Sequence, residues 1–201
     1  MLAVWPDEPD HGGPAAAACD AALQIVDGVA AFNRRSDGIR LPTRIGIHFG
    51  PLRLGSMGAL DHYEYVPIGD TVNTTARIEQ LNKRLGTRVL LSGAALPEGN
   101  AYLTRRLGSF RFAGRQQAIA IRELRGRRAD AGPGETAFVA AFEQALDAFR
   151  SERWKAARAL FTAAAEQNGG DRACRFFLSQ CTRLAATPPP AGWDGALTID
   201  K

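Results

Sequence analysis

The sequence predicts an α+β protein in which strands and helices alternate, followed by a small all-helical segment. Apolar residues alternate with polar ones at 43–50, 102–112 and 118–124, as in half-buried strands. They follow helical spacing at 15–35 and 70–85. Beyond a basic stretch rich in Gly and Pro, only helical spacing remains. We therefore expect a mixed domain at 1–126, a linker at 127–134, a helical segment at 135–186 and an extended tail at 187–201.

The first part of the mixed domain contains two predicted strand regions around a long helix. Met1–Trp5 is apolar and predicts a short buried strand, and residues 15–35 predict an amphipathic helix. Thr43–Gly50 predicts a strand that Gly50-Pro51 interrupts, and the strand pattern resumes at Leu52–Met57. These two strands are expected to form a hairpin. The polar and aromatic residues 61–65 are expected to form an exposed loop.

The second part of the domain begins with a helix after Gly69. Asp70 suits its N-cap and Gly86 its end. Its expected apolar stripe comprises Val72, Ala76, Leu81 and Leu85. Strands are predicted at 88–91, 102–112 and 118–124, and the last two are expected to turn at Gly114-Arg115.

The helical segment predicts three helices, separated at Ser151-Glu152 and at 168–170. Their apolar faces are Phe138, Phe142, Ala145, Leu146 and Phe149; Trp154, Ala157, Leu160, Phe161 and Ala164; and Cys174, Phe177, Leu178 and Cys181. The pattern is similar to about one and a half tetratricopeptide repeats, whose period is ~34 residues. A small cap that packs on the first domain is an equal alternative. Trp193 is the residue expected to pin the tail.

Composition sets limits on the class of protein. The 201 residues carry a net charge of +4, and basic residues gather at Arg105–Arg106 and at 122–128. A solvated arginine-rich face is the favoured interpretation, since no aromatic residues interleave with 122–128 as a nucleic-acid surface would require. The three cysteines fit no zinc spacing and predict buried free thiols in a cytoplasmic protein. No apolar run approaches the ~20 residues of a membrane span.

The most informative stretch runs from Thr43 to Lys83. It contains the blocks Arg44-Ile-Gly-Ile-His-Phe-Gly, then Gly55-Ser-Met-Gly, then Ile68-Gly-Asp-Thr-Val-Asn-Thr-Thr-Ala-Arg-Ile-Glu. Asn73 and Arg77 are four residues apart, so they share one face near a helix N-terminus. Helix N-termini favour phosphate, and the planar donor fork of arginine suits phosphate oxygens.

These blocks, in this order and at this spacing, closely resemble class III adenylate and guanylate cyclases. The resemblance runs from residue 1 to about residue 124 and implies a truncated ferredoxin-like nucleotide cyclase domain. It implies formation of cyclic AMP and diphosphate from ATP. In the family, the residue matching Arg77 stabilises the transition state at the α-phosphate, and the residue matching Asn73 orients the ribose. Asn73 and Arg77 are therefore the catalytic candidates.

Three further positions are candidates for substrate binding: Val66, Asp70 and Arg115. Val66 falls where relatives place a residue that reads the purine, but a valine side chain cannot hydrogen-bond a base edge, so the base stays open. Arg115 falls where relatives often contact the β- and γ-phosphates, and an exposed turn arginine is an equal alternative. His48 is expected to be structural. Asp61 and His62 match a loop that reaches the dimer partner in the family.

The resemblance also implies Mg²⁺ or Mn²⁺, held by two aspartates on segments that this sequence does not contain. No metal ligand is therefore assigned here, and the chain alone is not expected to cyclise ATP. Family active sites form between two chains, so the expected partner is a second copy or a full-length cyclase. Two alternatives stay open: a non-catalytic module that dimerises with an intact cyclase, and a helical-repeat scaffold.

Overall fold

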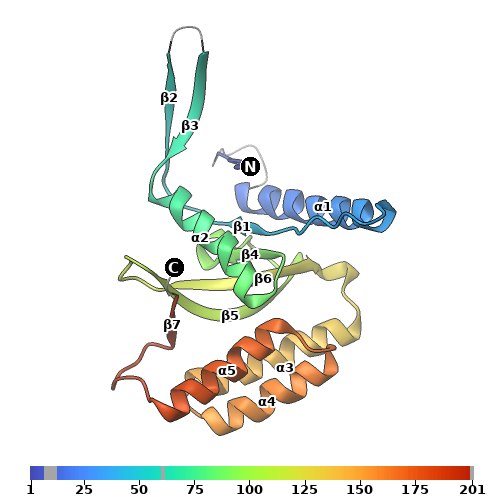
Figure 1. Cartoon of the computed structure of the whole chain (residues 1–201), viewed down its shortest axis with the longest axis vertical. Coiled ribbons are helices and arrows are strands. Elements are labelled where there is room, and N and C mark those ends of the chain that lie inside the picture. Colours follow the sequence, from blue (N-terminus) through green and yellow to red (C-terminus); the bar gives the residue numbers. More distant parts are fainter. Residues whose placement is uncertain (7–12, 60–61, 200–201) are drawn as a thin grey trace.

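The computed structural model describes residues 1–6, 13–59 and 62–199, with backbone only at 56–59 and 62–65. Its main sheet has five strands in the order β1-β4-β6-β5-β7 (Figure 1). These are β1 (Ile45–Ile47), β4 (Val89–Ser92), β5 (Tyr102–Phe112), β6 (Ile119–Arg127) and β7 (Ala196–Ile199). β1 is parallel to β4 and β7 is parallel to β5, while β6 is antiparallel to both of its neighbours. The mixed α and β fold is confirmed.

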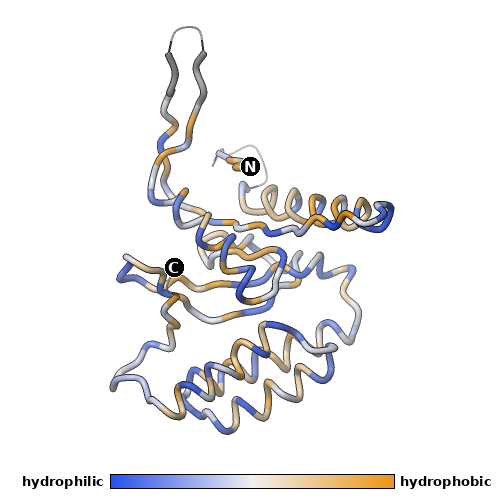
Figure 2. Tube along the Cα trace, viewed as in Figure 1, coloured by the Kyte–Doolittle hydropathy of each residue, from blue (hydrophilic) through white to orange (hydrophobic). Residues whose placement is uncertain are grey.

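Helix α1 (Pro14–Arg35) covers one face of this sheet. Proline in its first turn has no N–H to leave unpaired, and Arg34 and Arg35 lie favourably at its carboxyl end. Its buried Cys19, Ala22 and Val26 share a core with apolar residues of β4, β5 and β6. The expectation that no apolar run is long enough to cross a membrane is wrong by length and composition, since α1 meets both criteria (Figure 2). Only 22% of this apolar window is buried, on the side that packs against the sheet through Cys19, Ala22 and Val26.

The hairpin has different partners from those expected. β1 ends at Ile47 and pairs with β4, whereas β2 (Arg53–Ala59) pairs antiparallel with β3 (His62–Ile68). The prediction of a hairpin between 43–50 and 52–57 is therefore wrong, as is that of a loop at 61–65. The β2–β3 ladder projects away from the main sheet (Figure 1). Asp61 lies outside the described residues.

Met1–Trp5 is not the buried strand that its composition predicts. Residues 1–6 form no regular structure, and Leu2, Val4 and Trp5 are exposed. An apolar run of this length becomes a strand only where a neighbouring strand supplies hydrogen bonds, and the described part of the chain pairs no strand with it.

Helix α2 (Asp70–Leu85) and the helices α3 (Pro133–Arg150), α4 (Trp154–Gln167) and α5 (Arg172–Ala186) share a core with the sheet. The predicted apolar faces of α3–α5 are largely buried, with rings stacked edge to face around Phe142, Phe149 and Phe177. Residues 127–134 form the end of β6, the 3₁₀ turn η2 (Arg128–Asp130) and the start of α3. The tetratricopeptide likeness stays a prediction.

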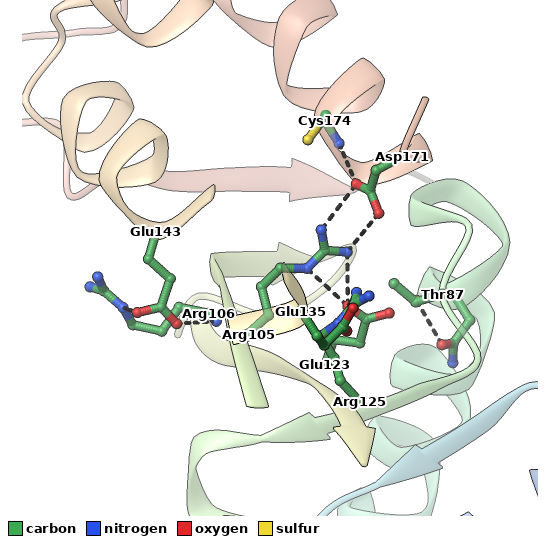
Figure 3. Close-up of polar contacts among 10 residues, drawn as sticks. Thr87, Arg105, Arg106, Glu123, Arg125, Glu135, Glu143, Asp171 and Cys174 are labelled. Carbon is green, nitrogen blue, oxygen red and sulfur yellow. Dashed lines mark hydrogen bonds and ion pairs between the residues drawn. The ribbon is translucent and has the colours of Figure 1, made fainter. Parts of the chain in front are cut away.

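The predicted solvated arginine face is wrong for Arg105, which is buried, and holds at Arg127 and Arg128, which are exposed. Arg106, Arg122 and Arg125 are partly buried. Arg105 is fully buried, with its guanidinium 2.8 Å from Glu123 and 3.0 Å from Asp171, the N-cap of α5 (Figure 3). It also lies 4.3 Å from the ring centroid of Phe142. Arg106 donates to Glu143 of α3 at 2.8 Å. Arg105 and Arg106 therefore join the sheet to the helices. The sequence alone does not predict these ion pairs, because the partners lie far apart along the chain.

All three cysteines are free and buried, as predicted. Burial raises the pKa of the Cys19 and Cys174 thiols to about 12 and that of Cys181 to about 11. They are therefore neutral thiols at neutral pH and act as small apolar side chains in the two cores.

Candidate functional site

The site is built on α2, which is held against β1 at very short range. A Cβ on Gly46 would lie 2.6 Å from both the Glu79 nitrogen and the Thr75 oxygen, so only glycine permits this approach. The buried Asn82 amide donates to the Ile45 carbonyl at 3.0 Å. The helix ends at Gly86 in the left-handed conformation, as predicted. Its position relative to the sheet is thus fixed by backbone contact.

The N-terminus of α2 differs from the prediction in one respect. The N-cap is Gly69, with φ of 146°, and its neighbour Asp70 is the first helical residue. Asp70 therefore does not cap the helix. The buried face of α2 comprises Thr71, Thr74, Ile78, Leu81, Asn82 and Leu85, so the predicted stripe is correct at Leu81 and Leu85, while Ala76 is exposed and Val72 is half-buried.

Asp70, Asn73 and Arg77 lie on one face of α2, because their spacing of three and seven residues returns them to nearly the same angle. Asn73 is exposed and Arg77 is half-buried. The Arg77 guanidinium donates through Nη1 to the Ala113 carbonyl at 2.8 Å. Ala113 belongs to the turn between β5 and β6, so this turn lies against the same face of α2.

Arg115 comes from the same turn. Its backbone N–H donates to the Phe112 carbonyl at 2.9 Å, and its guanidinium forms an ion pair with the Asp70 carboxylate. The structure therefore brings together Asp70, Asn73, Arg77 and Arg115, which the sequence places as far as 45 residues apart. Val66 lies on β3 opposite Gly55, on the strand that leads into α2. It is outside this cluster of side chains.

His48 lies just beyond β1 and beside the cluster. Its Nδ1 is 2.8 Å from the Ser92 hydroxyl, at the end of β4. Burial lowers the pKa of His48, and the positive charge of Arg115 lowers it further. Its partner is a hydroxyl group, which agrees with the structural role expected for it. His62 lies in β3, where only the backbone is described.

The described residues do not fit a divalent metal site by themselves. Nowhere in residues 1–6, 13–59 and 62–199 do three or more His, Cys, Asp or Glu side chains gather in the manner of a metal site. At the cluster, the Asp70 carboxylate is already paired with Arg115.

Within the cluster, Asp70 and Asn73 are exposed, whereas Arg77 and Arg115 are half-buried. Two hollows of about 420 and 350 Å³ lie elsewhere, the first between α1 and β6 and the second near the carboxyl end of α2. Neither is lined by Asp70, Asn73, Arg77 or Arg115.

The sequence of this chain matches the family model of the adenylate and guanylate cyclase catalytic domain over residues 9–122, more than half of its length. The chain belongs to this family. The matched span includes α1, the β2–β3 hairpin, α2 and the turn that carries Arg115, and it ends within β6. The cyclase blocks named from the sequence all lie inside it.

Individual relatives are similar over shorter shares of their own length. Adenylate cyclase 1 of Rhizobium meliloti is 37% identical over 130 residues, which cover 63% of this chain and 20% of that protein. Adenylate cyclase of Anabaena cylindrica is 32% identical over 92 residues, covering 43% of this chain and 18% of that protein. The chain thus corresponds to a fifth or less of these relatives. The adenylyl cyclase CyaB from P. aeruginosa aligns with a TM-score of 0.48 at 24% identity, over 63% of this chain and 66% of that one.

One element of the site had no signal in the sequence. The acceptor that holds Arg77 is the carbonyl of Ala113, and any residue could provide it. The proximity of His48 to Arg115 also depends on the parallel pairing of β1 with β4, which brings His48 to Ser92. A correct prediction that β1 pairs with β4 would have placed His48 next to Ser92.

Proposed function

We propose that this chain provides the Asn and Arg half of an adenylate cyclase active site, for the conversion of ATP to cyclic AMP and diphosphate. The observation that carries the proposal is that Asn73, Arg77 and Arg115 lie together at the amino-terminal half of α2, where the turn between β5 and β6 contacts the helix. In this proposal the other half, with the carboxylates that bind Mg²⁺ or Mn²⁺, comes from a second polypeptide. In this proposal residues 1–201 supply only this half of the site, and the complex forms in the cytoplasm.

The proposed catalytic roles of Arg77, Asn73 and Arg115 follow from the chemistry of their side chains. Arg77 stabilises the charge that develops on the α-phosphate, because its donor fork fits phosphate oxygens and one of its five N–H groups is already anchored on Ala113. Asn73 is exposed and one turn closer to the helix N-terminus, where its amide can orient the ribose. Arg115 exchanges the Asp70 carboxylate for the β- and γ-phosphates.

The base is assigned to adenine only on similarity to relatives that are adenylate cyclases, since Val66 offers no side-chain hydrogen bond. The family model covers both adenylate and guanylate cyclases, so the family alone does not decide between ATP and GTP. A competition of ATP with GTP in the assay below decides the base.

The experiment is a mixed-subunit assay. The chain is combined with a class III cyclase subunit that keeps its metal aspartates but whose own catalytic Asn and Arg have been replaced by Ala. Cyclic AMP is measured with ATP and Mg²⁺ or Mn²⁺. We expect activity in the mixture and none from either chain alone. Association without activity would instead support a non-catalytic module, and absence of association would refute the proposal.

A further inference from the structure

Strand β7 reaches the candidate site through a single residue. It pairs in parallel with β5, from Ser109 opposite Ala196 to Phe112 opposite Ile199. One residue further on, the Ala113 N–H donates to the Ile199 carbonyl at 3.2 Å. The carbonyl of the same Ala113 accepts the hydrogen bond from Arg77 at 2.8 Å. Ala113 is therefore held by β7 on one side and holds Arg77 on the other.

A second contact joins the segment before β7 to the same turn. The Arg111 guanidinium is 2.6 Å from the Asp194 carboxylate, and its Nε donates to the Gln116 carbonyl at 2.9 Å. Gln116 follows Arg115 directly. The turn is thus tied to residues 194–199 on both sides of Arg115.

The segment is itself anchored on the helices. The indole of Trp193 packs against Phe149 and Trp154, with ring centroids 5.8 and 5.6 Å apart, and its Nε1 donates to the Ala196 carbonyl at 3.0 Å. The Ala196 N–H in turn donates to Asp194 at 3.0 Å. These contacts connect the core of α3 and α4 to the position of β7, and Figure 1 shows β7 beside β5.

We propose that β7 and its anchor Trp193 position the turn at 113–116, so that Arg77 and Arg115 are held where one triphosphate can meet both. The inference rests on the proposed function for its substrate. β7 lies beyond residue 122, where the match to the family model ends. The turn is largely exposed at the end of two strands, so each hydrogen bond to it, including the one from Ala113 to β7, contributes to its position.

The first test needs no activity. Removing residues 198–201 deletes the Ile199 carbonyl but keeps the buried Ala196 and Leu197. We expect about tenfold faster amide exchange at Ala113 in NMR, as for the loss of one hydrogen bond, and shifted guanidinium signals of Arg77 and Arg115. The full chain with Thr198→Ala is the control and should match the wild type. Unchanged Ala113 exchange, or unchanged Arg77 signals, would refute the inference.

If the shortened chain does not fold, Asp194→Ala gives the same information in the full chain. Its matched control is Asp147→Ala, which removes an equally exposed carboxylate from another β5 arginine. Only Asp194→Ala should shift the Arg77 and Arg115 signals. Identical spectra at both arginines for the two variants would contradict the role of the segment.

The second test uses the mixed-subunit assay. The shortened chain should lower kcat by about 10- to 100-fold, as small misplacements of catalytic groups do, with a smaller change in KM. If β7 only stabilises the fold and does not position the turn, the shortened chain should form less active complex while kcat per complex stays unchanged. That result would refute the inference. If the wild-type mixture is inactive, the proposed function fails. The NMR result still decides whether β7 determines the positions of Arg77 and Arg115.

Discussion

Arg77 and Arg115 are each held by an oxygen of the protein, and the two acceptors differ in kind. Arg77 donates to a backbone carbonyl, whereas Arg115 pairs with the Asp70 carboxylate. A neutral carbonyl uses one donor of Arg77 and leaves its charge available, so Arg77 is oriented in advance. Asp70 neutralises Arg115 until a triphosphate competes for it. The two arginines are thus expected to contribute differently, Arg77 to kcat and Arg115 to KM.

At the same scale, His48 gives stability a pH dependence. Its folded pKa lies below the ordinary value of 6.5, because burial and Arg115 disfavour the charged ring. The contribution of neutral His48 to the free energy of unfolding is therefore fully present above pH 6.5. It is lost as the pH falls through the lowered pKa of the folded state. We expect urea unfolding to show less loss of stability between pH 7.5 and 5.5 in His48→Gln than in the wild type. Equal losses in the two proteins would exclude His48 as the cause.

Single residues also mark the limit of sequence reasoning here. The spacing of Asn73 and Arg77 was sufficient to place them on one helix face, because helical periodicity is local. The Ala113 carbonyl and the buried Arg105 were not predictable, since both depend on which distant segments meet. An arginine in a strand looks the same in sequence whether it faces water or Glu123 and Asp171.

At the scale of elements, the close approach of β1 to α2 fixes the position of the site residues on α2 relative to the sheet. A Cβ at Gly46 would meet backbone atoms of α2 at 2.6 Å, and backbone cannot move aside as a flexible side chain can. A Cβ added at Gly28, within α1, would instead meet nothing within 4 Å outside its own helical backbone. The chain therefore offers two glycines with opposite expected responses.

We predict that Gly46→Ala lowers the free energy of unfolding by about 1–3 kcal/mol, as overpacking does. Gly28→Ala should raise it by about 0.5–1 kcal/mol, because alanine is the better helix former. Denaturant titration of both variants measures the two values. A stability for Gly46→Ala equal to that of the wild type would contradict the tight packing of β1 on α2.

The elements that the sequence missed share one cause. The pairing of β2 with β3, the short β1 and the strand β7 all depend on choice of partner, whereas local patterns predict only whether a segment favours a strand. Helices were predicted more accurately, since α1 and α3–α5 carry their own periodicity and punctuation. Residues 196–199 are too few to stand out within a tail rich in Pro and Gly.

At the scale of the whole molecule, the helices and the cyclase sheet share one core. Arg105 is buried between Glu123 of β6 and Asp171 of α5, and aromatic rings of α3 cover its guanidinium. The charge of Arg105 and its hydrogen bonds hold the pKa of Asp171 below its usual value, although burial alone would raise it. This ion network joins the two parts of the chain.

We predict that Arg105→Ala lowers the free energy of unfolding by about 3–5 kcal/mol, because it removes the arginine partner of the mostly buried Asp171 and one of the two arginine partners of Glu123. Arg106→Ala, at a more exposed pair, should cost about 1 kcal/mol or less. Both variants are compared by urea unfolding, and each should show one transition because the core is shared. Two separate transitions in the wild type would show that sheet and helices unfold independently.

Asn73, Arg77 and Arg115 lie together at the amino-terminal half of α2, with Asn73 exposed and both arginines half-buried. The proposal that a second polypeptide completes this site is the central claim. The most direct test is Arg77→Ala in the mixed-subunit assay, with Arg84→Ala at the far end of α2 as the matched control. We predict that Arg77→Ala lowers kcat by about 10³- to 10⁵-fold, as for comparable arginines in phosphoryl transfer, while Arg84→Ala stays near the wild type. Equal rates for the Arg77→Ala and wild-type mixtures would contradict the account.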